Sequence, residues 1–239
     1  YGVCGAMETL LLAESVVDIL KDRGNLTDPW QDTMGMGYPV LHHYQHLPHI
    51  VLALIHTITF ESIPLIDLLR WTNYLLLSFF PLSVYWAMRR FGFDPLPAAM
   101  SGLVASLVGN DFQYYGGLGY RNYTYEGWSL YAQLWGMIFL PVALAVSYRT
   151  LTEGRGYLWS IVLLSATLMS HLVFGYIAFI TLGALTFTNI SRDVSVIWIR
   201  WRRLAIVFLL VTIVASYFLI PFFIDREFFN ASVLSKDTV

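Results

Sequence analysis

Two carboxylates stand at positions from which they could act together on a substrate. Glu8 lies at the start of an amphipathic segment, and Asp111 follows Asn110 where an apolar segment ends. A pair of carboxylates can hold a divalent cation such as Mg²⁺ or Mn²⁺, or take a proton from an acceptor hydroxyl. The structural alternative is that Glu8 stabilises a helix N-terminus and that Asp111 is a solvated loop residue.

The polar segment 111–127 supplies further candidates. Arg121 is its only basic residue and suits contact with a phosphate group, and Glu126 is a further acid near it. The same segment is rich in tyrosines, and Trp128 follows it. These aromatic rings could stack on a sugar, or they could form the aromatic belt typical of a membrane interface.

Histidines form the third group. His171 lies among apolar residues, and an ionisable side chain inside a membrane is a functional candidate by default, whereas a satisfied histidine at a helix turn is the structural alternative. His42, His46 and His49 have the helical spacing of metal ligands. Pro39 precedes that stretch, Pro48 lies within it, and no acidic residue lies among the histidines, so these side chains are interpreted as interfacial histidines of mixed role.

The amino-acid composition indicates the class of protein that carries these candidate residues. Of 239 residues, 57% are hydrophobic and 13% are charged, about half the roughly 25% usual for soluble domains. This excludes a disordered chain, a coiled coil and an ordinary soluble domain, and it indicates an all-α polytopic membrane protein. The net charge of −2 gives no sign of a nucleic-acid partner, and one cysteine excludes a disulfide framework.

Residues 1–64 are too polar and too interrupted to span a membrane. The segment 7–22 has apolar residues on one side of a helix and charges on the other, which predicts an interfacial amphipathic helix. A loop over 25–45 follows. Residues 47–60 are apolar but about 14 long, short of the ~20 needed to cross, so a second interfacial helix is expected there.

The remaining chain, 65–224, reads as a transmembrane helical domain. The stretch 157–190 would be about 50 Å long as one helix, against a hydrocarbon core of ~30 Å, and basic residues flank both ends. An even number of passes is therefore expected, as a hairpin of two short helices turning near 171–175. The other predicted spans are 65–88, 95–110, 128–148 and 204–224.

Basic residues predict the orientation. Eight of the 14 lysines and arginines lie in three loops, which places these loops in the cytoplasm: 89–94, 149–156 and 191–203. Residues 1–64, 111–127 and the tail 225–239 are then extracytoplasmic, so Glu8 and Asp111 share the outer surface. We expect the 239 residues to be a segment of a longer protein with at least one further span before Tyr1.

Several short motifs resemble GT-C-type glycosyltransferases, and most closely the 6-pyruvoyl-tetrahydropterin-synthase-related integral membrane proteins. The resemblance covers most of the chain. In the first external loop its motifs are Gly5-Ala6-Met7-Glu8, Gly24, Pro29-Trp30, Gly37-Tyr38-Pro39, Tyr44 and Leu47-Pro48. Further along they are Arg89-Arg90-Phe91-Gly92, Gln133 to Pro141 and Ser170-His171.

The resemblance implies a cavity facing the outside, a polyprenyl-phosphate-linked sugar donor and transfer to an acceptor on the extracytoplasmic side of a prokaryotic plasma (inner) membrane. The first-loop acid, Glu8, would be the base, and Asp111 the second acid. Arg121 and His171 would meet the donor phosphate. The stretch 38–48, with Tyr38 and Tyr44, would line the lipid entrance.

Two other functions fit the same sequence. In the resembling family the first acid is commonly aspartate followed four positions later by histidine, whereas here Glu8 is followed by Leu12. This departure favours, as the alternative, a non-catalytic membrane subunit that holds partner proteins or lipids. A transporter is the third hypothesis, and the near absence of charge within the spans argues against it.

Overall fold

The structure, a computed structural model, describes residues 2–21, 30–31, 38–39, 41, 45–107, 131–188 and 194–225, with residues 2–8, 31, 38 and 39 described by their backbone alone. Over these ranges the predicted all-α class is confirmed. The helices are α1 (Gly2–Lys21), α2 (Leu47–Ile58), α3 (Leu65–Arg90), α4 (Pro95–Leu107), α6 (Tyr131–Glu153), α7 (Tyr157–Ser170), α8 (Leu172–Leu185), α9 (Val194–Val214) and α10 (Ser216–Ile224). A short antiparallel ladder joins β1 (Trp30–Gln31) and β2 (Tyr38–Pro39).

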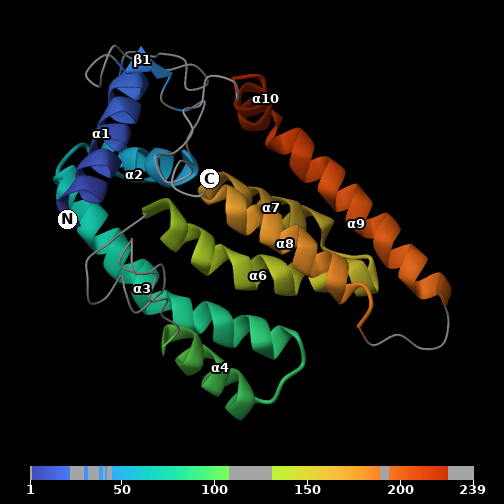
Figure 1. The fold of residues 1–239 in the computed structure, drawn as a ribbon. Coiled ribbons are helices and arrows are strands. Elements are labelled where there is room, and N and C mark those ends of the chain that lie inside the picture. The colour runs from blue at the N-terminus through green and yellow to red at the C-terminus, as the bar shows by residue number, and fades with distance from the viewer. Residues whose placement is uncertain are drawn as a thin grey trace, which may run out of the picture.

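Helix α6 lies at the centre of the bundle (Figure 1). Helix α3 packs along one side of α6 and carries α4, while α7 and α8 pack on the other side and α9 lies against them. Aliphatic side chains fill the space between α6, α7, α8 and α9, and each buried leucine or valine contributes about 1.5–3 kcal/mol. Their most buried members include Leu151, Leu164, Leu182, Val207 and Val211.

Helices α1 and α2 cover the end of the bundle where α3 and α6 begin. The two-faced pattern predicted for 7–22 is observed: Leu12 and Val16 are buried against α2, whereas Glu14 and Asp18 are exposed. The helix begins earlier than expected, at Gly2. In α2 the proline at the second position needs no amide partner there, which suits a helix start.

The stretch 157–190 contains two helices that fold back on each other, α7 and α8, with the break at His171. His171 has an extended backbone, with φ −155° and ψ 108°. The glycine four residues later allows the close approach, because a Cβ at Gly175 would lie 2.8 Å from the Cα of Leu168.

The last part of the chain differs from the sequence expectation. Loop was expected through 191–203 and one span over 204–224, but α9 is already helical at Val194 and bends by 75° into α10. The early start has a polar cause. Arg200, expected in a loop, is buried in α9 and donates to the carbonyl oxygens of Thr186 and Thr188, at 3.1 and 2.5 Å. Its charge is thus stabilised by the negative, C-terminal end of the α8 dipole.

Membrane-spanning capacity is concentrated in one helix. Within the described ranges, α6 alone is both long and apolar enough to cross a membrane, and α9 with α10 would qualify together as one bent span. Helix α3 has 26 residues but is less apolar. Helices α4, α7 and α8 have 13 or 14 residues, about 20 Å each, short of a ~30 Å core. Crossing by these helices stays a prediction.

Candidate functional site

Most residues predicted to form the site fall outside the part of the chain whose side chains are described. Glu8 and Tyr38 are placed by their backbone, in α1 and β2, and His171 is described in full. The distance between the Glu8 and Asp111 carboxylates, and the metal ion that they would share, stay predictions. The predicted residues that lie wholly outside the described residues are Tyr44, Asp111, Arg121 and Glu126.

The backbone of Glu8 belongs to the helix that covers one end of the bundle. Glu8 stands four residues before Leu12, which packs on α2, and five before Ala13, which packs where α2, α3 and α6 meet. Helix α1 therefore joins the bundle through contacts with three helices. The side chains that pack beneath α1 are therefore the described residues nearest to Glu8, the predicted base.

A buried polar cluster lies beneath α1 and α2. His49 of α2 is 1% exposed, and its ring lies 5.8 Å from that of Tyr131, itself 1% exposed at the start of α6. The Tyr131 ring in turn lies 6.2 Å from Trp135, one helical turn further along. The three rings join α2 to α6 by edge-to-face contacts, each of which adds about 0.5–1.5 kcal/mol beyond the area it buries.

Burial keeps the His49 ring neutral. The pKa of His49 falls from 6.5 to about 4, mainly because of burial; the hydrogen bond with the carbonyl of Gln45, at 3.2 Å, acts in the opposite direction, and the nearby His46 adds to the lowering. With the proton placed on Nδ1, that bond fixes the tautomer and leaves Nε2 as the basic nitrogen. His49 is therefore an uncharged imidazole at neutral pH.

Two donors of the same cluster have unused capacity. The Tyr131 hydroxyl approaches Thr72 and Trp135, but neither this hydroxyl nor the Trp135 indole N–H makes a well-formed hydrogen bond to any residue the structure describes. A buried polar group without a partner costs about 1–3 kcal/mol. A hydroxyl-rich ligand or another polar group at this place would regain that free energy.

His171 lies against α6 near Gly136. Its ring packs on Phe174, with centroids 4.7 Å apart, and its Cβ would lie 2.9 Å from a Cβ at Gly136. The backbone of His171 is satisfied by Thr167 and Gly175. Its Nδ1 has no hydrogen-bond partner among the described residues, so the ring is only partly accounted for by structure.

Sequence reasoning did not find Tyr131, Trp135 or Tyr217. The first two have a weak signal, since they are aromatic residues four apart at the start of an apolar helix, a pattern that interface belts share. Tyr217 has none, because its partner, His46, is 171 residues away.

A metal centre is not evident in the described part of the chain, where no group of three or more His, Cys, Asp or Glu side chains could hold an ion. His42 lies outside the described residues, and the histidines that the structure describes have separate surroundings. His46 pairs with Tyr217, His49 is buried, and His56 bonds the carbonyl of Ile63 at 2.9 Å.

Comparison with known proteins found no match: no family model matches the chain, and neither a curated protein nor a solved structure matches it significantly.

Proposed function

We propose that this chain belongs to an integral membrane glycosyltransferase of GT-C type, which transfers a sugar from a polyprenyl-phosphate-linked donor to an acceptor on the extracytoplasmic side. The observation that carries the proposal is the position of α1. This amphipathic helix bears Glu8 and packs over the starts of α3 and α6, away from the ends of these two helices.

The arginines support this orientation. Arg89 and Arg90 occupy the last turn of α3, and Arg203 donates to the carbonyl oxygens of Leu151 and Thr152 near the end of α6, at 2.8 and 2.9 Å. Basic residues gather on the cytoplasmic side of membrane proteins. In that frame α1 and α2 lie at the outer surface, where a lipid-linked donor and its acceptor would meet.

The exposed surface supports membrane placement. Large apolar side chains are exposed along the outward faces of the helices, and soluble monomers rarely expose such surface continuously. Lipid would cover it. Along α3, α4, α8 and α9 these side chains include Trp71, Phe79, Leu82, Leu96, Leu103, Val173, Ile180, Phe208, Leu209 and Ile213.

In the proposed reaction, Glu8 accepts the proton of the acceptor hydroxyl, and the hydroxyl oxygen attacks the anomeric carbon of the donor as the polyprenyl phosphate leaves. Asp111 orients the hydroxyl or shares a divalent cation with Glu8. Arg121 and His171 contact the leaving phosphate. Neutral His49 and Tyr131 lie buried beneath α1, the helix that bears Glu8, and would support it from below.

The test is sugar transfer by the full-length protein reconstituted in vesicles with polyprenyl-phosphate sugars. Glu8→Gln should keep the fold and lower transfer by ~10²-fold or more, the usual contribution of a positioned base. Glu14→Gln is the matched control, because Glu14 is an exposed acid of the same helix. This variant should retain transfer.

Unchanged transfer in both Glu8→Gln and Asp111→Asn would refute the catalytic roles. A protein without any transfer, but with stable partner chains in the purified complex, would instead support the non-catalytic subunit, which shares the scaffold and the membrane placement.

A further inference from the structure

A cavity of about 620 Å³ opens at the arginine-bearing end of the bundle, between α3, α6 and α7. Three arginines from three different segments line it. Arg90 ends α3, Arg149 lies near the end of α6, and Arg155 lies in the turn before α7. Trp86 and Trp159 complete the rim. The glycosyltransferase proposal gives this cavity no role.

The charge of the cavity is only partly neutralised. Arg149 donates to the carboxylate of Glu153 at 2.9 Å, an exposed pair. Arg90 lies over the ring of Trp86, 4.9 Å from its centroid, and keeps its charge. Neither Arg90 nor Arg155 has an ion pair within the part of the chain that the structure describes. The described residues that line the cavity include no acidic side chain.

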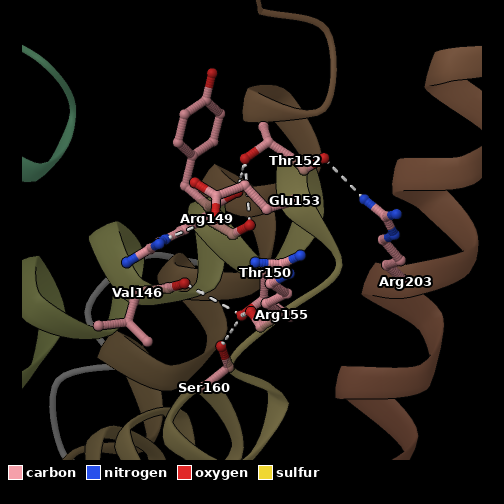
Figure 2. A network of polar contacts seen from close by, with 9 residues as sticks. Val146, Arg149, Thr150, Thr152, Glu153, Arg155, Ser160 and Arg203 are labelled. Atoms are coloured by element: carbon pink, nitrogen blue, oxygen red, sulfur yellow. Dashed lines mark hydrogen bonds and ion pairs between the residues drawn. The ribbon is translucent and has the colours of Figure 1, made fainter.

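Buried hydroxyls hold Arg155 in place beside Arg149. Figure 2 shows that Thr150, one residue after Arg149, contacts both the turn and the start of α7. Its Oγ1 lies 2.9 Å from the carbonyl oxygen of Arg155 and 2.6 Å from Oγ of Ser160, and both hydroxyl residues are fully buried. The turn that carries Arg155 is thereby fixed to both helices.

One wall of the cavity is apolar. Val142 and Val146 of α6 and Leu163 of α7 form it. A soluble anion would use the arginines and leave this wall uncovered. A ligand with both a phosphate and a hydrocarbon chain would use both.

We propose that this cavity binds an anionic phospholipid, with the headgroup phosphate between Arg90 and Arg155 and an acyl chain along the apolar wall. Guanidinium groups pair with phosphate oxygens through two parallel N–H···O bonds, so two or three arginines can enclose one phosphate. Basic pockets between membrane helices on the cytoplasmic side recognise such headgroups. The inference rests on the membrane placement in the proposed function, and it is independent of sugar transfer.

The test measures the association of spin-labelled phosphatidylglycerol, relative to spin-labelled phosphatidylcholine, with the full chain in phosphatidylcholine vesicles. Wild type should prefer phosphatidylglycerol. The double variant Arg90→Gln, Arg155→Gln should lower this preference by about tenfold, because it removes two positive charges that attract the anionic headgroup. Arg202→Gln is the matched control, because Arg202 is an exposed arginine of α9 that does not line the cavity.

Two further arms separate the alternatives. Inorganic phosphate should fail to displace the labelled lipid, and effective competition would instead indicate a site for soluble phosphate. The Arg90→Lys, Arg155→Lys variant keeps the charge, so full retention of the preference would show general attraction without phosphate recognition. Equal losses in the double variant and in Arg202→Gln would also overturn the proposal.

A protein that inserts into vesicles but shows no lipid preference would refute this site alone, whereas failure to insert would refute the membrane placement.

Discussion

His46 and Tyr217 meet across 171 residues of chain and join the start of α2 to α10. The His46 Nε2 and the Tyr217 hydroxyl share a hydrogen bond, and the two rings pack edge to face with centroids 5.3 Å apart. Phe218 packs on the other side of His46, at 5.2 Å, and is 2% exposed. These contacts join α10, which follows the 75° bend after α9, to the residue before α2.

Tyr217→Phe removes this hydrogen bond and keeps the ring contact. We expect the free energy of unfolding to fall by about 1 kcal/mol, the usual net contribution of one hydrogen bond. Thermal unfolding in detergent micelles measures it. Tyr176→Phe is the control, because Tyr176 is 67% exposed on α8, and it should leave the midpoint unchanged. Equal midpoints for the two variants would show that the contact does not hold α10.

Burial of His49 makes stability depend on pH. Its pKa is about 4 in the folded chain, against about 6.5 in the unfolded chain. Below pH 6.5 the unfolded chain therefore binds a proton that the folded chain does not. Stability should be complete above pH 6.5 and fall by roughly 3 kcal/mol as the pH drops to about 4. Unfolding midpoints measured across this range give the slope.

His49→Gln should abolish that part of the pH dependence, because the side chain no longer titrates. His56→Gln is the matched control, since His56 lies in the last turn of the same helix and outside the buried cluster. If wild type and His49→Gln lost stability equally between pH 6.5 and 4, the histidine would not be buried in the neutral form.

Three arginines of α9 should differ sharply in their contribution to stability. Arg203 reaches the last turn of α6, where its Nη1 donates to the carbonyl oxygens of Leu151 and Thr152. Bonds from a charged donor contribute about 1.5–3 kcal/mol, so Arg203→Gln should lower the free energy of unfolding by about 2 kcal/mol. Arg200→Gln should act likewise on the end of α8. Arg202→Gln, on the exposed face, should have no effect on the unfolding midpoint.

Local patterns predicted the helices well where periodicity alone decides them. Glu14 and Asp18 alternate with Leu12 and Val16 at helical spacing, and the structure exposes the first pair and buries the second. The boundaries of α9 were missed because Arg200 was treated as a loop charge. Its partners are backbone carbonyls of a neighbouring helix, and no pattern within the sequence identifies those.

For the candidate site, the sequence predicted where His171 lies, and its role stays a prediction. His171 was singled out as a histidine among apolar residues, and the structure places it at the break between α7 and α8. The cluster of His49, Tyr131 and Trp135 was not predicted, because it forms only when α2 packs on α6. The roles of Glu8 and Asp111 follow from topology and resemblance, and they stay predictions.

Gly175 should be essential to the hairpin of α7 and α8. A Cβ at this position would lie 2.3 Å from Cδ1 and 2.8 Å from Cα of Leu168. The second atom belongs to the backbone, so a side-chain rotation cannot relieve the overlap and the two helices must separate. Gly175→Ala should therefore lower the free energy of unfolding by about 1–3 kcal/mol, the usual cost of overpacking a core.

Gly183 of the same helix supplies the matched control. A Cβ there meets only Cη2 of Trp201, at 3.6 Å, which is an ordinary contact. Gly183→Ala should be neutral or should stabilise the protein by up to about 1 kcal/mol, because alanine loses less backbone entropy than glycine in a helix. Both variants add one methyl group to α8, so opposite shifts of the unfolding midpoint isolate the contact with Leu168. Shifts of the same sign and size would mean that α7 and α8 do not pack closely at Gly175.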